Sequence, residues 1–241
     1  MVHAASRLGS CLALALLVIA ARAPRADAFS ACTDNAAWVS PGATLPPHGR
    51  VVYYSDSGHG EVDDTKLVAT INKKPVKTKI THVASAPYEL TLVEIDSDKT
   101  GTLSISFGNR DSSATYKIAR KVDMPKEIKG KTTRFGRAYQ HSTVHEAYDG
   151  LAIVLPAGTP AITAHVKVRR DSKADWAELD VPLRPDDATR APSVWIGELG
   201  CVRNYTPALL EACVDIEVVL TLVDGSTRKV SLPAHVVLRK P

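Results

Sequence analysis

The stretch that decides the fold is residues 214–222, Val-Asp-Ile-Glu-Val-Val-Leu-Thr-Leu, which is followed by Val223 and the pair Asp224-Gly225. Apolar side chains stand at every second position of this stretch, and acidic or hydroxyl side chains occupy most positions between them. Alternation with a period of two places the apolar set on one face of a half-buried β-strand. The Asp-Gly pair predicts a tight hairpin turn, so a second strand is expected through Val230 and Leu232.

The same period recurs along the chain. Residues 103–107, Leu-Ser-Ile-Ser-Phe, put three apolar side chains on one face and two serines on the other, and residues 162–169 alternate in the same way. No segment after residue 28 keeps an apolar 3.6-residue period for three turns, so a short turn at 207–212 is the only helix expected. Further strands are expected at residues 50–55, 67–72, 76–84, 88–96, 114–121, 150–155, 177–183 and 194–200.

Turn residues separate these strands every eight to twelve positions, which is typical of β-sandwiches rather than of a parallel sheet. The sequence predicts an all-β chain with a signal peptide at residues 1–28, a first sandwich at 29–123, a linker at 124–136 and a second sandwich at 137–241. One larger sandwich is the alternative. The residues expected to anchor the cores are Trp38, Leu103, Ile105, Trp195, Ile216 and Val218.

Residues 39–52, Val-Ser-Pro-Gly-Ala-Thr-Leu-Pro-Pro-His-Gly-Arg-Val-Val, resemble the opening of bacterial Ig-like domains. Those domains begin with a Pro-x-Gly-Ala-Thr-hydrophobic-Pro stretch ahead of an apolar strand. The second half resembles Ig or fibronectin-III domains in strand rhythm only. The resemblance implies two tandem Ig-like β-sandwiches and says little about function, because such sandwiches host many roles.

The first residues have the three parts of a secretory signal. Arg7 precedes an apolar run from Cys11 to Ala21 that is too short to span a bilayer, and Ala-Asp-Ala at 26–28 supplies a small-x-small cleavage site. We therefore expect a secreted or periplasmic protein whose mature chain starts at Phe29. The alternative is a lipoprotein anchored at Cys32, since Phe-Ser-Ala-Cys at 29–32 resembles a lipobox.

Charge and cysteine counts change when this segment is removed. The full chain carries 30 Lys and Arg against 26 Asp and Glu, and removal of three Arg and one Asp leaves 27 against 25, or +2. Such a weak charge argues against nucleic acid as a partner. Of the three remaining cysteines, Cys201 and Cys213 are predicted to form a disulfide because the loop between them is short. Cys32 is then free, buried, lipidated or the true partner of one of the others.

Several patterns suggest metal ions. The opening is also similar to secreted copper carriers of the copper-resistance type, which ligate copper with an N-terminal histidine, whereas this mature chain starts at Phe29 and lacks a methionine set. His48 and His59 could still meet in space. The loop from Asp56 to Asp64 carries four carboxylates and a histidine, and it is either a metal site or a solvated tip.

Residues 96–101, Asp-Ser-Asp-Lys-Thr-Gly, resemble the first half of a calcium loop. Phe107 stands where the bidentate glutamate is expected, so a plain turn is predicted. His141 and His145 have the spacing that places two imidazoles on one helix face, but their surroundings predict a strand, in which they would lie too far apart for one ion. His165 and His235 fall on the polar side of alternating segments and are expected to be solvated.

The sequence contains no Gly-x-Ser-x-Gly, phosphate loop or Cys-x-x-Cys, so no catalytic, cofactor or metal residue is assigned. Basic residues cluster twice, and each cluster could contact anionic polysaccharide or lipid, although protection of strand edges and linkers is the expected role. The first cluster is Lys73, Lys74, Lys77 and Lys79, and the second is Lys117, Arg120, Lys121, Lys126, Lys129, Lys131, Arg134 and Arg137.

These observations predict an exported, non-catalytic structural or binding module of the cell envelope, with an envelope protein or polysaccharide as its partner. A membrane is a partner only if Cys32 is lipidated. One alternative is a periplasmic metal-binding carrier. Another is a secreted hydrolase whose catalytic triad is not visible in the sequence.

Overall fold

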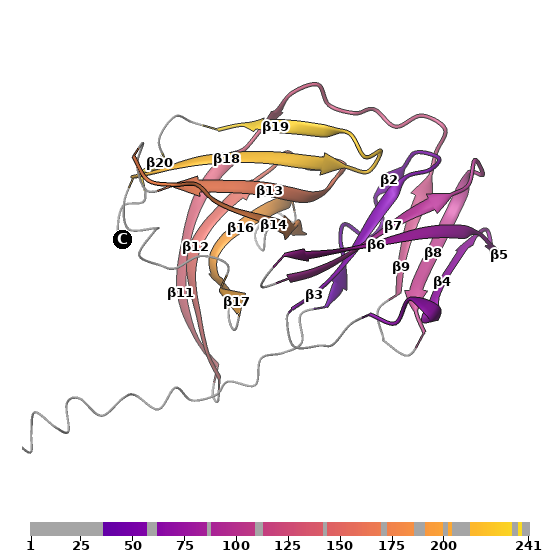
Figure 1. Ribbon diagram of the computed structural model, residues 1–241, viewed down its shortest axis with the longest axis horizontal. Coiled ribbons are helices and arrows are strands. Elements are labelled where there is room, and N and C mark those ends of the chain that lie inside the picture. Colours follow the sequence, from indigo (N-terminus) through magenta and orange to yellow (C-terminus); the bar gives the residue numbers. More distant parts are fainter. Residues whose placement is uncertain are drawn as a thin grey trace, which may run out of the picture.

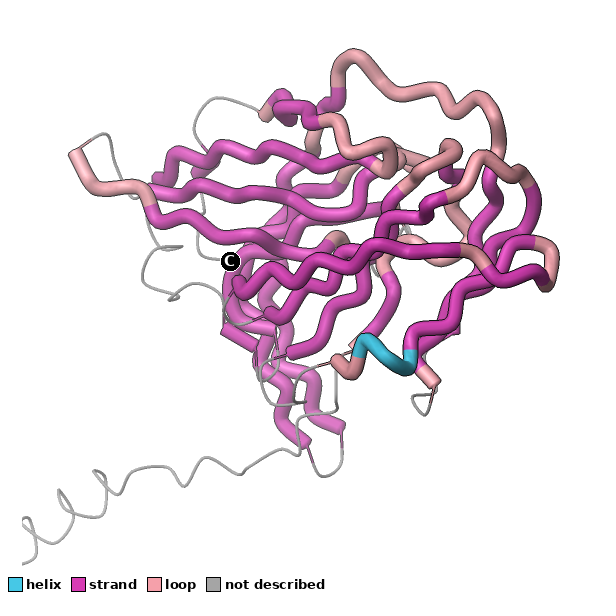
Figure 2. Tube along the Cα trace, turned by 45° about the vertical axis from the view of Figure 1, so that its right-hand side comes forward, coloured by secondary structure: helices cyan, strands magenta, loops and turns pink. Residues whose placement is uncertain are grey.

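The computed structural model describes residues 36–56, 62–85, 88–108, 113–141, 144–169, 173–185, 191–199, 202–203, 213–232 and 236–237. Figure 1 shows that strands joined by loops make up most of these residues, and Figure 2 shows a helical turn among them, η1 at Asp64–Lys66. The chain is therefore all-β, as predicted. No helix in these ranges is long and apolar enough to cross a membrane. The predicted signal peptide, Cys32 and the turn at 207–212 lie outside the described residues.

Strands β1 to β9 make two sheets, which we call the N-terminal half. The first sheet has the order β1-β3-β7-β6, with β1 at Ala37–Trp38, β3 at Arg50–Asp56, β7 at Tyr88–Asp96 and β6 at Lys77–Ser85. The second has the order β2-β9-β8-β4-β5, with β2 at Thr44–Leu45, β9 at Ser113–Ile118, β8 at Gly101–Phe107, β4 at Leu67–Ile71 and β5 at Lys74–Pro75. Lettered along the chain, these orders are A-B-E-D and A′-G-F-C-C′, which is the pairing of an Ig-like sandwich.

Strands β10 to β20 make the other two sheets, the C-terminal half. One has the order β11-β12-β16-β15 with β17 on β16, at Lys131–His141, Val144–Val154, Pro192–Leu199, Arg184–Pro185 and Val202–Arg203. The other has the order β10-β19-β18-β13-β14 with β20 on β18, at Ile128–Lys129, Thr227–Ser231, Cys213–Leu222, Ala161–Arg169, Ala177–Pro182 and Val236–Val237.

The pairing scheme of the N-terminal half recurs in the C-terminal half with one exchange. In each half a short strand pairs in parallel with the last long strand, as β2 does with β9 and β10 with β19. The short strand is second in chain order in the N-terminal half and first in the C-terminal half. These sheets are consistent with Ig-like domains. β10 and the start of β11 fall inside the segment predicted to be a linker, at residues 124–136.

The core of the N-terminal half is centred on three aromatic rings. Trp38 on β1 and Tyr53 on β3 come from one sheet, and Phe107 on β8 comes from the other. Their ring centroids lie 5.1 to 5.4 Å apart, with Trp38 stacked on Phe107 and Tyr53 edge-on to both. Aromatic pairs in these geometries add about 1 kcal/mol beyond the burial of their area. The rings therefore hold the two sheets together.

Most residues predicted to anchor the cores are buried. Trp38, Leu103, Ile105 and Val218 have side chains at most 5% exposed. The prediction for Trp195 was wrong, because Val194 and Ile196 point inward and the period of two turns the residue between them outward. The indole Nε1 of Trp195 donates to the hydroxyl of Ser193 at 2.7 Å. Ile216 is partly buried against the core.

Two turns have the backbone that their residues predict. The predicted hairpin joins β18 to β19, where Gly225 has a φ of +82° and the Asp224 carboxylate accepts from the N–H of Ser226 at 2.9 Å. Asn72 and Lys73 join β4 to β5 with φ angles of +50° and +67°. Positive φ at both central residues is typical of a tight hairpin turn.

The two halves contact each other (Figure 1). β13 packs against β3, and β14 packs against β6 and β7. The guanidinium of Arg184 on β15 lies 5.0 Å from the ring centroid of Tyr54 and 5.5 Å from that of Tyr88. Buried apolar side chains of both halves belong to one continuous cluster.

Candidate functional site

A patch of paired charges lies on the outer face of the sheet that contains β14, β13, β18 and β19. On β13, Ala164, Val166 and Val168 are buried, and the residues between them, His165 and Lys167, point outward. This arrangement follows from the alternation of the sequence, since successive side chains of a strand point to opposite faces. We call the outward residues His165, Lys167, Glu178, Asp180, Glu217 and Lys229 the charged face.

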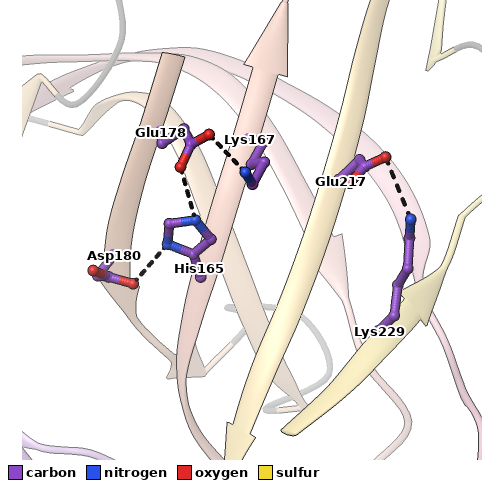
Figure 3. Close-up of polar contacts among 6 residues, drawn as sticks. All are labelled: His165, Lys167, Glu178, Asp180, Glu217 and Lys229. Atoms are coloured by element: carbon purple, nitrogen blue, oxygen red, sulfur yellow. Dashed lines mark hydrogen bonds and ion pairs between the residues drawn. The ribbon is translucent and has the colours of Figure 1, made fainter. Parts of the chain in front are cut away.

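His165 lies between two carboxylates of the neighbouring strand β14 (Figure 3). Its Nδ1 is 3.0 Å from Oδ1 of Asp180, and its Nε2 is 3.2 Å from Oε2 of Glu178. Lys167 donates to the other oxygen of Glu178 at 2.6 Å. The register explains these contacts, because His165 stands opposite Asp180 and Lys167 stands opposite Glu178.

The charges continue across β18 and β19. Lys167 also stands opposite Glu217 of β18, and Glu217 pairs with Lys229 of β19 at 3.3 Å (Figure 3). Negative and positive side chains therefore alternate over four strands. At one end of β13, Arg169 donates to Asp215 at 2.9 Å and lies 4.5 Å from the ring centroid of Trp176.

The electrostatics of the charged face centre on Glu178. The hydrogen bond from Lys167 is the main reason that the pKa of Glu178 is lowered, and the contact with His165 contributes. The side chains of His165, Lys167 and Glu178 are 34% to 44% exposed, so water reaches all three. A hydrated face that carries charges of both signs can contact a surface of complementary charge.

His165 lies on the polar side of its strand, as predicted. Its carboxylate partners were not predicted, because cross-strand register is set by tertiary structure. The sequence does indicate that Glu178 and Asp180 share one face of a predicted strand, because the apolar Leu179 stands between them.

A second cluster surrounds the predicted calcium-like segment, which connects β7 to β8. The amide of Asn72 fills this turn: its Oδ1 accepts from the N–H of Thr102 at 3.0 Å, and its Nδ2 donates to the carbonyl of Thr100 at 3.2 Å. Gly101 adopts a φ of +136°, and a Cβ there would lie 2.2 Å from that amide. These hydrogen bonds tie the segment to the β4–β5 hairpin, and that it is a plain turn rather than a calcium loop stays a prediction.

His48 contacts the same turn. Its Nε2 lies 3.0 Å from Asp98, and its Nδ1 lies 3.7 Å from Asp96, so its two nitrogens face different carboxylates. His59, the other histidine considered for copper, lies outside the described residues. Within the described ranges, no group of three or more His, Cys, Asp or Glu side chains could hold a metal ion.

The polar loop from Asp56 to Asp64 is described only at its ends. Asp63 accepts from the N–H of Thr65 at 3.1 Å and caps η1, and its pKa is lowered chiefly by hydrogen bonds from Thr65 and Lys66. Asp64 contacts Nε2 of His82 at 3.0 Å, a pair that sequence reasoning missed. The capping contact, together with an ion pair to Lys66 at 3.1 Å, gives Asp63 a structural role.

His141 and His145 lie at the tip of one hairpin. β11 ends at His141, β12 begins at Val144, and Gln140 stands opposite His145 in the register. The prediction of a single strand here was wrong, because β11 and β12 pair antiparallel and the two histidines lie on opposite strands. His235 and Cys201 lie outside the described residues, so the Cys201–Cys213 disulfide stays a prediction.

The lysines of the first basic cluster are exposed and lie at sheet edges. Lys73 and Lys74 belong to the β4–β5 hairpin, and Lys77 and Lys79 lie on β6. Since β5 and β6 are terminal strands of their sheets, these lysines fit the expected role of blunting an edge. The exposed residues of the second cluster are Lys117, Arg120, Lys121, Lys126, Lys129 and Lys131.

No protein-family profile and no curated protein sequence matches the chain. Among solved structures, it is similar to a type I pullulanase from Bacillus subtilis complexed with maltose, with 9% identity, a TM-score of 0.25 and 79% of the chain covered. The chain spans about a quarter of that pullulanase (24%). It is also similar to the tandem Ig repeats of Dlar, with 10% identity, a TM-score of 0.23 and coverage of 80% of this chain and 93% of that one. The I9–I11 tandem of titin has 10% identity, a TM-score of 0.21 and coverage of 79% and 62%.

The fold and the charged face define the class: an all-β protein whose sheets are consistent with Ig-like domains and which exposes a patch of paired charges.

Proposed function

We propose that this chain is an exported, non-catalytic structural or binding module of the cell envelope, built from two tandem Ig-like sandwiches. The tandem arrangement is supported by the recurrence of one strand order, and among the described strands every pairing joins members of the same half. Export is supported by the apolar run after Arg7 and by Ala-Asp-Ala at 26–28. The proposed partner is an envelope protein or polysaccharide.

The observation that carries the binding role is the alternation of charge on the charged face. Lys167 is held by Glu178, and Lys229 is held by Glu217, at 2.6 and 3.3 Å. Side chains held in this way keep a fixed pattern on a rigid sheet, and a fixed pattern of charge selects partners and speeds their encounter. The same side chains point outward from the sheet and are open to water, and this arrangement favours recognition over catalysis.

The binding role can be tested by exchanging one pair. The double variant Glu217→Lys with Lys229→Glu keeps an ion pair but reverses the pattern of the face. We expect about tenfold weaker retention on purified sacculi or on solubilised envelope proteins, because the reversed face then presents like charges to the partner. The melting temperature should fall only slightly, because the new lysine at position 217 stands opposite Lys167 while the exchanged ion pair is kept. The matched control exchanges Lys121 and Asp123, an exposed pair 4.0 Å apart outside the charged face. Equal retention of both exchanged proteins would contradict a role for this face.

Export is tested separately by the intact mass of the protein recovered from envelope and culture fractions. We expect a chain that starts at Phe29 and contains one disulfide. A diacylglycerol on Cys32 would establish the lipoprotein alternative. Full-length chain retained in the cytoplasm would contradict export.

A further inference from the structure

The longest edge strand among the described residues is β11. It is a terminal strand of its sheet and pairs with β12 over all eleven residues, from Lys131 opposite Val154 to His141 opposite Val144. No described strand pairs with its other side. In an antiparallel strand, alternate residues direct their N–H and C=O groups to each side, so about five residues of β11 direct theirs to the open edge.

The far end of this hairpin extends beyond the rest of the sheet (Figure 1). β12 pairs with β16 only from Tyr148 to Val154, so residues 138–141 and 144–147 pair only with each other among the described strands. A two-stranded ribbon is marginally stable in water, and a third strand would stabilise it.

Other edges of the described sheets are protected by features that β11 lacks. β1, β2, β5, β10 and β15 are two residues long. β14 packs against β6 and β7 of the other half, so β14 and β6 both lie at the contact between the halves. β11 is both long and free of proline, so its edge can accept an added strand.

The basic residues beside the open edge of β11 determine which charge an added strand should carry. From residue 129 to residue 137, at the start of β11, the sequence carries four basic residues, Lys129, Lys131, Arg134 and Arg137, and no acidic one. Lys129 and Lys131, which flank the start of β11, are exposed. Two copies of such an edge would repel each other, whereas an acidic strand would be attracted.

We propose that the open edge of β11 binds an extended, acidic peptide segment by strand addition. Main-chain hydrogen bonds would supply affinity, and the basic residues would select Asp and Glu in the segment. This inference rests on the proposed binding role and assigns it a protein partner. It is independent of the charged face and of export.

The test selects a displayed library of ten-residue segments on the immobilised mature protein, followed by titration with synthetic peptides of the enriched sequences. We expect enrichment of Asp and Glu, and loss of binding when alternate backbone amides of the peptide are N-methylated. Two proline variants, Thr132→Pro and Thr133→Pro, provide a built-in comparison. Successive N–H groups point to opposite sides, so one variant removes a bond to β12 and the other removes a donor at the open edge. The edge variant should keep its melting temperature and bind peptide about tenfold more weakly.

Charge is tested by Lys131→Glu, with Lys117→Glu on β9 as the matched control. The first should weaken binding of the acidic peptide, and the second should not. Absence of acidic enrichment, or binding that survives N-methylation and both prolines, would overturn the proposal. A dimer of the protein that is lost in the edge variant would also overturn the proposal, because a second copy would then be the partner. Retention on anionic polysaccharide that is lost in Lys131→Glu but kept in both proline variants would overturn it too, because the basic residues would then bind without strand addition. If envelope retention persists while peptide binding fails, strand addition is wrong and the proposed function stands.

Discussion

The backbone N–H of Arg50 donates to the carbonyl of Val223 at 2.7 Å, and this bond joins the start of β3 to the β18–β19 turn of the other half. The guanidinium of Arg50 reaches Oε2 of Glu94 at 3.1 Å and packs against Gly225. A Cβ on Gly225 would lie 2.6 Å from that guanidinium. The close approach of Arg50 to the β18–β19 turn therefore depends on a glycine at position 225.

Gly225→Ala should lower the free energy of unfolding by more than the cost of placing an alanine at a positive φ. Its φ of +82° costs an alanine about 1–2 kcal/mol, and its Cβ would displace Arg50 from Glu94. Gly158→Ala is the matched control, because Gly158 has a φ of +76° and open space around it. Chemical denaturation should give a larger loss for Gly225→Ala. In an Arg50→Ala background the two losses should become equal, and a difference that persists there would contradict the role of Arg50.

Arg184→Met should loosen the contact between the halves. It removes the charge that lies 5.0 and 5.5 Å from the rings of Tyr54 and Tyr88, and a cation over an aromatic face contributes about 1 kcal/mol or more when desolvated. We expect calorimetry to give a broader transition, with a calorimetric enthalpy above the van't Hoff enthalpy. Arg120→Met, at an exposed position, should leave the transition unchanged. A sharp two-state transition in Arg184→Met would show that the continuous apolar cluster couples the halves without this residue.

Glu178 predicts a dependence of stability on pH. Because the hydrogen bond from Lys167 lowers its pKa in the folded protein, the carboxylate stabilises the fold above its ordinary pKa of 4.5. That contribution is lost as the pH falls below 4.5 and through the lowered value. Glu178→Gln should therefore lower the melting temperature at pH 7 and have little effect at the acidic end of a titration. In a Lys167→Gln background the difference at pH 7 should shrink, and an unchanged difference would point to another partner.

Much of the fold was accessible from the sequence because it is encoded in local patterns. Alternation predicted the long strands, including β7, β8, β13 and β18. The pair Asp224-Gly225 predicted the hairpin that joins β18 to β19. The two-residue strands were not predicted, because they carry too few residues to show a period. Gly130 falls in the segment predicted to be a linker, yet a Cβ there would lie 2.7 Å from Ile153 and 2.8 Å from Val230. Its role depends on close packing between sheets, which no local pattern reveals.

The site was less predictable than the fold for the same reason. His165 was placed on the correct face, but Asp180 and Glu178 reach it through the β13–β14 register, and Asn72 reaches the 96–101 turn from the β4–β5 hairpin. These partners lie 13 to 30 residues apart in sequence. Register and sheet packing bring them together, and both are tertiary properties.

Phe107 decides between a calcium loop and a core strand at residues 96–107. Its ring stacks on Trp38 at 5.4 Å and is 3% exposed, so Phe107→Glu would bury a carboxylate among aromatic rings. Although this substitution supplies the residue that a calcium loop lacks, we expect it to abolish the folded state, as judged by circular dichroism, and to give no saturable calcium response. Phe107→Leu should stay folded with a moderate loss of stability, since it keeps most of the apolar volume. A folded Phe107→Glu protein that melts higher with calcium would show that the 96–101 turn can be converted to a cation site, and would contradict the argument that the packing around Phe107 fixes it as a plain turn.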